Sequence, residues 1–584
     1  MIAPARRQHG AALMLLAAIV VLGVTWMMIT ALSNASQRTA STREHNARVL
    51  KEAKTALIAW MAANALDNAD DNPGKLPCPQ AWGDVGGSME GRAGSVCAAP
   101  AAGWLPWRTL GIPKLFDAYG NQLWYAVSPG WHLPSAATKL TINSNTAGQI
   151  SLDGQAVVAL LIAPGPALNI APNAGQITAG CTARTQSRSQ NPPAFTPNPL
   201  DYLDCHNGTT ADNVFASSVV DNASNAVFND QVLAVTAADV MPALEAAIAK
   251  RIELRIVPVL KAVYSTPTWG STVSVANPLL PFAVPFADPT TSDYRGAAGT
   301  FAGLLPFNQT QGCDSGTDPR CTNPTTGPSG FLAFSKNGAD SATTLIPPLP
   351  LGWIRTQSTC NWSGNNYVCT GEYQLAPIMV TFTLRVTNVA MGLRTFDPTK
   401  VTCTAVDDAG GGIGLQNVGC QTVSMALQPD GSALITVTTN FTPDIVLSGW
   451  GTYANYTITF DRAIFGDHVL LDANDATTGW FVRNEWYRLL HYATMSSQTA
   501  AVLPAGTPGC TTGTNCLTVT NFSPTDNNKR GLLILAGRAL SGQTRPNATA
   551  ANYLEAGNAT GAYIKKNVSP VGGFNDRFVV ISEN

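Results

Sequence analysis

The stretch from Arg6 to Val24, RRQHGAALMLLAAIVVLGV, decides how the rest of the chain is interpreted. It begins with two arginines, and residues 11–32 contain no charged side chain. As a helix, this uncharged run would be about 33 Å long, which is enough to cross a bilayer. The two arginines lie on the short N-terminal side of this run. They would keep the N-terminus in the cytoplasm and place the rest of the chain on the other side of the membrane. The sequence therefore predicts a transmembrane helix over 11–32.

The residues that follow favour a long helix over a cleaved secretory signal. Residues 37–66 lack Pro and Gly, and their apolar positions recur at helical spacing: Val49, Leu50, Ala53, Leu57, Trp60 and Met61. A secretory signal peptide cleaved near Ser33-Asn34-Ala35 would have a shorter apolar run, of about 7–15 residues. It would also have no reason to continue into an amphipathic helix. A plain single-span anchor followed by a core helix is the other interpretation.

A short basic leader ending in Gly10, followed by an apolar helix and an amphipathic continuation, resembles the type IV pilin-like and pseudopilin family. The resemblance implies that a prepilin peptidase removes the leader 1–10 by cutting between Gly10 and Ala11. It further implies a single-pass protein of the inner membrane with a periplasmic domain, which later joins a cell-surface fibre. The implied partners are other pilins or minor pseudopilins, the peptidase and the inner membrane.

One position departs from the family pattern. Most pilins carry Glu at the fifth mature position, which is Leu15 if the mature chain begins at Ala11. In the family, this Glu neutralises the buried N-terminal amine of a neighbouring subunit. A charge at bilayer depth costs about 2.5–3.5 kcal/mol or more unless it is paired. Losing it resembles the large minor pseudopilin and some minor pilins, which implies a place at the fibre tip.

The cysteines suggest an oxidising compartment. There are 12, and they fall into six neighbouring pairs: Cys78 and Cys97, Cys181 and Cys205, Cys313 and Cys321, Cys360 and Cys369, Cys403 and Cys420, Cys510 and Cys516. An even count in near pairs predicts six local disulfides, although spacing alone does not fix the connectivity. Metal binding is the alternative, but zinc sites usually contain CxxC pairs and this chain has none.

Blocks of sequence recur in the same order and indicate an internal duplication. The pairs are LPCP (76–79) with VPFA (284–287), GWLPW (103–107) with GLLPF (303–307), NQLWYAV (121–127) with NEWYRLLHYAT (484–494), LLIAPGPAL (160–168) with LLILAGRAL (532–540), YLD (202–204) with YLE (553–555), and FND (228–230) with FND (574–576). Each copy also begins with a predicted helix, over 37–66 and 237–264. Asn229-Asp230 and Asn575-Asp576 are interpreted as turn caps, with an ion site as the alternative.

We therefore expect an α+β fold in which the transmembrane helix continues into a pilin-like helix that carries two tandem pilin-like heads. The first head covers 33–236, and the second covers 237–307 plus 475–584. An inserted, disulfide-stapled β-domain occupies 308–474, where residues 376–390 and 420–461 alternate between apolar and polar. Gln428-Pro429-Asp430-Gly431 predicts a turn between two paired strands there, and an antiparallel domain of this kind can be a sandwich.

Composition and motifs exclude several function classes. Charged residues make up 12% of the chain, the formal net charge is −2, and no basic run exists, so nucleic acid is not an expected partner. The six histidines are scattered, and no HExxH or Walker motif appears, so we expect no enzyme and no catalytic residues. Asp472, Asn474 and Asp475 form the one candidate calcium loop, with a solvated turn as the alternative and no other cofactor expected.

The sequence thus favours a structural minor subunit at the tip of a type IV pilus or a type II secretion pseudopilus. An adhesive or ligand-binding role of the inserted domain is compatible with that assignment. The alternative is a membrane-anchored periplasmic binding protein or enzyme that is unrelated to fibres.

Overall fold

The computed structural model describes residues 9–67, 71–81, 84, 86–97, 101–135, 137, 139–171, 182–188, 199–208, 213–217, 228–264, 280–292, 294–297, 299–311, 333–344, 354–363, 366–374, 378–387, 396–407, 419–428, 432–441, 453–461, 464–465, 470, 475–496, 516–523, 526–568 and 573–583. The chain forms two compact units. The first comprises Met1–Met61, Lys75–Leu140 and Thr146–Val240, and the second comprises Ala62–Gly74, Thr141–Asn145 and Met241–Asn584.

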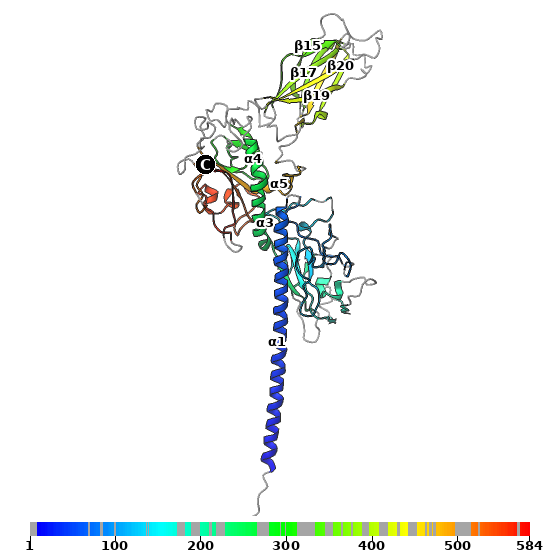
Figure 1. The fold of residues 1–584 in the computed structure, drawn as a ribbon, viewed down its shortest axis with the longest axis vertical. Helices are drawn as coiled ribbons and strands as arrows, with labels where there is room; N and C mark the ends of the chain where they lie inside the picture. Colours follow the sequence, from blue (N-terminus) through cyan, green and yellow to red (C-terminus); the bar gives the residue numbers. More distant parts are fainter. Residues whose placement is uncertain are drawn as a thin grey trace, which may run out of the picture. The chain divides into compact units, whose positions relative to one another are not determined.

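The longest element is helix α1, His9–Leu66, drawn in blue in Figure 1. Its C-terminal half contains the amphipathic residues predicted to be helical. There, buried side chains recur every three or four residues, at Asn46, Val49, Leu50, Ala53, Leu57, Met61 and Ala65. Lys54 ties this half to the first unit, because its ammonium donates to the Ala234 carbonyl at 3.0 Å and pairs with Asp239 at 2.8 Å.

The first unit contains an antiparallel sheet of order β1-β2-β5-β9. Its strands are β1 (Ala102–Trp104), β2 (Trp124–Val127), β5 (Ala159–Ala163) and β9 (Gln231–Val235). Smaller sheets are formed by β3 (Ile150–Leu152), β4 (Gln155–Val157) and β8 (Val214–Phe215), and by β6 (Asn169–Ile170) and β7 (Arg184–Thr185).

The second unit contains most of a broken helix and a sheet that matches the first. The helix consists of α3 (Ala237–Arg251), a π-helical turn (Ile252–Ile256) and α4 (Val257–Tyr264). The π turn ends two residues before Pro258, whose ring cannot enter a regular helix without removing a backbone hydrogen bond. The sheet has the order β11-β22-β23-β24, with β11 (Ala302–Leu304), β22 (Leu490–Thr494), β23 (Lys529–Leu535) and β24 (Arg577–Glu583).

The two four-stranded sheets share their strand order and their register. Gly103 lies opposite Tyr125 in the first sheet, and Gly303 lies opposite Tyr492 in the second. A side chain at either glycine would collide with a backbone carbonyl: an added Cβ would stand 2.6 Å from the Gln80 oxygen at Gly103 and 1.8 Å from the Val284 oxygen at Gly303. The recurring sequence blocks therefore occupy corresponding strands, and the small residue recurs because a bridging segment crosses at that point.

The inserted region forms two antiparallel sheets that share one core. One sheet contains β13 (Ala333–Lys336), β14 (Ser341–Thr344), β17 (Ile378–Thr387), β20 (Ala433–Phe441) and β19 (Cys420–Leu427), and the other contains β15 (Ile354–Ser363), β16 (Asn366–Gln374), β21 (Tyr453–Asp461) and β18 (Val401–Asp407). Both contribute to one buried cluster, for example through Phe382 and Phe460, whose ring centroids are 5.8 Å apart. The predicted hairpin is confirmed, since β19 pairs antiparallel with β20.

The remaining elements are short. They are β10 (Arg295–Ala297), which pairs in parallel with β12 (Asn308–Gln311), and helix α5 (Gly479–Arg483). Single 3-10 turns occur at Pro129–Trp131, Pro199–Asp201, Cys205–Gly208, Pro398–Lys400, Trp486–Leu489, Ala550–Asn552 and Ala556–Thr560.

The predicted fold class and localisation are wrong. The protein is mostly β-sheet with few helices rather than two pilin-like α+β heads on a membrane helix. Over the part of the chain that the structure describes, α1 included, no helix has the length and apolar character that crossing a membrane requires. This finding overturns the transmembrane helix over 11–32 and the single-pass placement in the inner membrane. The prediction depended on the absence of charge over 11–32, and that property alone does not establish a membrane span.

Candidate functional site

The main feature of the described surface is an apolar part of α1 that is largely exposed. Six large apolar side chains between positions 20 and 27 are each more than half exposed: Val20, Val21, Leu22, Val24, Trp26 and Met27. Trp26 is 71% exposed and Met27 is 74% exposed. We call these six residues the exposed α1 segment. Contiguous exposed apolar surface of this kind usually marks an interaction site.

The residues predicted for processing and fibre packing lie at the start of the same helix. The backbone of Gly10 and Ala11 belongs to the beginning of α1, which starts at His9, and Leu15 follows in the next turn. Their side chains lie outside the described part of the structure. Cleavage after Gly10 and the packing role of Leu15 therefore stay predictions.

Three of the predicted neighbour pairs of cysteines are bonded. Disulfides join Cys78 to Cys97, Cys360 to Cys369 and Cys403 to Cys420. Cys516 is also disulfide-bonded, and none of the described cysteines is free. Cys181, Cys313, Cys321 and Cys510 lie outside the described residues, as does the side chain of Cys205. Disulfides are typical of oxidising compartments.

The candidate calcium loop is only partly described. Asp475 Oδ1 accepts hydrogen bonds from the Thr477 and Thr478 amides, at 2.8 and 2.6 Å, and from the Thr478 hydroxyl at 2.9 Å. This oxygen therefore serves the turn that leads into α5. Asp472 and Asn474 lie outside the described residues. Within the described ranges, no three His, Cys, Asp or Glu side chains are grouped in a way that could hold a metal ion.

A buried pair of carboxyl groups joins two loops of the first unit. Asp204 Oδ2 accepts from the amides of Asn229 and Asp230, at 2.5 and 3.1 Å. In return, Asp230 Oδ2 accepts from the Asp204 amide at 3.1 Å and from Asn207 Nδ2 at 3.0 Å. Each acid thus holds the backbone of the other, across a separation of 26 residues.

The second unit repeats this arrangement atom for atom. Glu555 Oε2 accepts from the amides of Asn575 and Asp576, at 2.9 and 3.0 Å. Asp576 Oδ2 accepts from the Glu555 amide at 3.1 Å and from Asn558 Nδ2 at 2.7 Å. The repeated YLD/YLE and FND blocks were the sequence signal for these pairs. The sequence predicted that Asn229-Asp230 and Asn575-Asp576 each cap their own turn. Instead, the two blocks of each unit bond to each other, and a local pattern does not reveal a link between residues so far apart in the chain.

Burial makes these acids weak. It raises the pKa of Asp204 to about 6, and burial together with the Asp204 charge raises the pKa of Asp230 well above its usual range. Burial and the Glu555 charge raise the pKa of Asp576 to about 8. An arginine stands over the tyrosine of each repeated block, Arg188 over Tyr202 at 5.4 Å and Arg545 over Tyr553 at 4.8 Å. We interpret the paired acids and the arginine–tyrosine contacts as groups that hold the loops of each unit in place.

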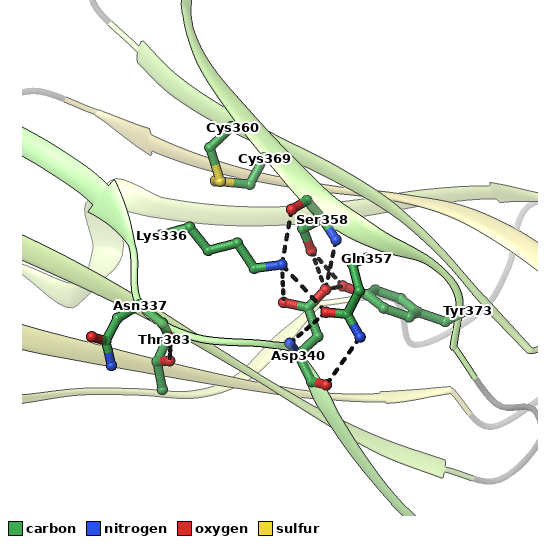
Figure 2. A network of polar contacts seen from close by, with 9 residues as sticks. All are labelled: Lys336, Asn337, Asp340, Gln357, Ser358, Cys360, Cys369, Tyr373 and Thr383. Atoms are coloured by element: carbon green, nitrogen blue, oxygen red, sulfur yellow. Dashed lines mark hydrogen bonds and ion pairs between the residues drawn. A yellow bond between two sulfur atoms is a disulfide. The ribbon is translucent and has the colours of Figure 1, made fainter.

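A further polar network lies in the inserted β-domain (Figure 2). The carboxylate of Asp340 is fully buried and accepts from the Ser358 amide (2.7 Å), the Ser358 hydroxyl (2.6 Å) and the Tyr373 hydroxyl (2.8 Å). The Lys336 ammonium stands 3.1 Å from its other oxygen. Burial alone would raise the pKa of Asp340, but these donors hold it below its usual value. The network fixes the turn between β13 and β14 onto β15 and β16.

Comparison with models of protein families, with curated proteins and with solved structures gives no significant match to this chain. Among the described residues, the exposed α1 segment is the most extensive run of exposed large apolar side chains.

Proposed function

We propose that this protein is a structural, non-enzymatic subunit of a type IV pilin-like fibre, and that it joins the fibre through the exposed α1 segment. The observation that carries this proposal is the exposure of that segment, whose six apolar side chains are 51% to 74% exposed. The pattern from Arg6 to Val24, with Gly10 before an apolar helix, supports the choice of a pilin-like assembly over other fibres.

The distribution of the six side chains favours several neighbours over one. At 100° per residue, positions 20, 21, 22, 24, 26 and 27 are spread around the whole circumference of the helix. A helix that is apolar on all sides is normally buried on all sides. Full burial stabilises by roughly 1.5–3 kcal/mol for each large apolar side chain. Apolar helices of neighbouring subunits would supply that cover in a fibre core.

Leu15 supports a position at one end of the fibre. Within a pilin-like shaft, a subunit would have to accept the buried amine of a neighbour, and leucine has no acceptor. An unpaired buried amine would cost several kcal/mol or be neutralised. An end subunit can offer its own amine to a Glu of the adjacent subunit and receive none.

The test uses two substitutions in the exposed α1 segment. Trp26→Ser with Met27→Ser should sharply reduce the amount of protein that is recovered with sheared fibres, while leaving the unfolding transition of the purified protein unchanged. The matched control is Leu254→Ser with Val406→Ser, which also replaces exposed apolar side chains, 55% and 59% exposed, but outside α1. Equal recovery of both double variants would refute an assembly role for the segment.

A further inference from the structure

The second unit contains a cavity on the face of its sheet that carries His491. The cavity has a volume of about 210 Å³ and lies between β22–β23 and the segment 550–563. Its lining includes Phe286, His491, Ile534, Leu554, Asn558 and Tyr563. Every residue that lines it belongs to the second unit, and none carries a full charge when His491 is neutral.

The equivalent place in the first unit is packed with aromatic rings. There, the indole of Trp104 lies 4.8 Å from that of Trp124 and 4.9 Å from the ring of Tyr202. The shared register aligns Trp104 with Leu304 and Trp124 with His491, because both pairs are cross-strand partners at the same positions. Two indoles are thus replaced by smaller side chains, while the tyrosine is retained as Tyr553.

The first unit also fills this region with side chains that have no described counterpart in the second. Ile150, Val157 and Phe215, from β3, β4 and β8, pack against Trp124 in one buried cluster. Within the described residues of the second unit, the smaller side chains on the sheet leave a cavity where the first unit packs aromatic and aliphatic side chains.

Among the described residues that line the cavity, only His491 has a buried side-chain nitrogen or oxygen without a hydrogen-bond partner. The residue is 3% exposed, and its Nε2 has no hydrogen-bond partner within the described part of the chain. Its ring stacks on Phe286 with centroids 5.2 Å apart and planes 10° apart. Burial, aided by the nearby Arg545 charge, lowers the pKa of His491 to about 3, so the imidazole is neutral under ordinary conditions. A buried polar atom without a partner is costly, and a ligand would satisfy it.

We propose that this cavity binds a small, uncharged aromatic molecule that carries one hydrogen-bonding group, which pairs with His491 Nε2. The size agrees, since a cavity of about 150 Å³ lined by apolar side chains can hold benzene. The lack of charged lining residues excludes an ionic ligand, because its charge would be buried without a counter-charge. The aromatic rings of Phe286 and His491 in the lining suit an aromatic ligand.

The test measures the binding of two probes, 4-fluorophenol and fluorobenzene, to the full-length protein by fluorine NMR. We expect saturable binding of 4-fluorophenol, and binding of fluorobenzene weaker by roughly threefold to tenfold, the value of one net hydrogen bond. His491→Phe should reduce the affinity for 4-fluorophenol to that for fluorobenzene. Val406→Leu, at an exposed position on β18, is the control and should change neither affinity.

The variant Leu304→Trp with His491→Trp copies the packed arrangement of the first unit. It should retain the fold, with an unchanged or higher melting temperature, and lose at least tenfold in affinity for both probes. If this variant fails to fold, Ala559→Leu is the substitute. The larger side chain narrows the cavity from the loop side and should lower the affinity for both probes. Binding of 4-fluorophenol that is unchanged in these variants, or is not saturable at millimolar concentration in the native protein, would overturn the proposal.

Discussion

At the residue scale, the paired carboxyls link the stability of the protein to pH. The pKa of Asp576 is raised to about 8 in the folded protein, whereas an unfolded chain has a value near its ordinary one of about 4. The folded state therefore holds more protons between these values. Its stability is fully present below the lower value and is lost as the pH rises towards 8. Asp204 and Asp230, whose pKa values are also raised, act in the same direction.

We predict that the free energy of unfolding falls between pH 6.5 and pH 8, by about 2 kcal/mol at most through Asp576. His491 does not contribute in this pH range. Its pKa is lowered in the folded protein, so it destabilises the fold only when the pH falls below the ordinary histidine pKa of about 6.5. Asp576→Asn should flatten the dependence, because the amide cannot lose a proton and can still accept from Asn558. Urea unfolding at several pH values provides the measurement, and an equally steep dependence in the variant would contradict the assignment.

The second prediction at this scale concerns Asp340. Asp340→Ala should destabilise the protein by about 3–5 kcal/mol, because it leaves the Lys336 ammonium and the donors on Ser358 and Tyr373 without their buried acceptor. Tyr373→Phe removes only one donor and should cost about 1–2 kcal/mol. Urea unfolding of both variants measures the difference. Similar losses from the two changes would show that Asp340 is not the centre of the network.

At the scale of elements, the disulfides hold neighbouring strands of the inserted domain. Cys360 and Cys369 are direct cross-strand partners in the β15–β16 pair and are 9 residues apart in sequence. Cys403 and Cys420 connect β18 of one sheet with β19 of the other and are 17 residues apart. The first bond therefore reinforces a hairpin, whereas the second joins the two sheets.

We predict that replacing both cysteines of a pair by serine destabilises the protein by about 2.5–3 kcal/mol for Cys360–Cys369 and by slightly more for Cys403–Cys420, which closes the longer loop. The two double variants serve as controls for each other. Unfolding under non-reducing conditions measures the losses. A negligible loss in both would show that the unfolded chain is not constrained by these bonds.

At the scale of the whole molecule, the proposed end position predicts a low copy number. Because Leu15 offers no acceptor to a neighbouring amine, we expect very few copies per fibre, all at one end. Immunogold labelling of sheared fibres with antibodies against the inserted domain tests this expectation. Label that is spread evenly along the shaft would contradict the end position. Leu15→Glu provides the matched comparison and should allow incorporation along the shaft.

Much of the local structure could be predicted from the sequence. The alternation of residues 420–461 predicted the β19–β20 hairpin, the apolar spacing of 37–66 predicted the packed half of α1, and neighbouring cysteines predicted three of the observed bonds. The repeated blocks indicated the two related sheets. Apart from the repeated blocks, these signals are local, because helical and strand periodicity and short loops are written within a few adjacent residues.

The tertiary structure alone decided the features that depend on long-range partners. The apolar run at 11–32 was interpreted as a membrane span, yet no described helix qualifies as one. The cross-bonding of Glu555 with Asp576, and the hollow at His491 where the first unit packs Trp124, follow from the register of strands that are far apart in the chain. Sequence determined which segments form strands and helices through the periodicity of their side chains. Only the packed chain determined which of those side chains meet, because burial and pairing are set by neighbours that the local pattern does not contain.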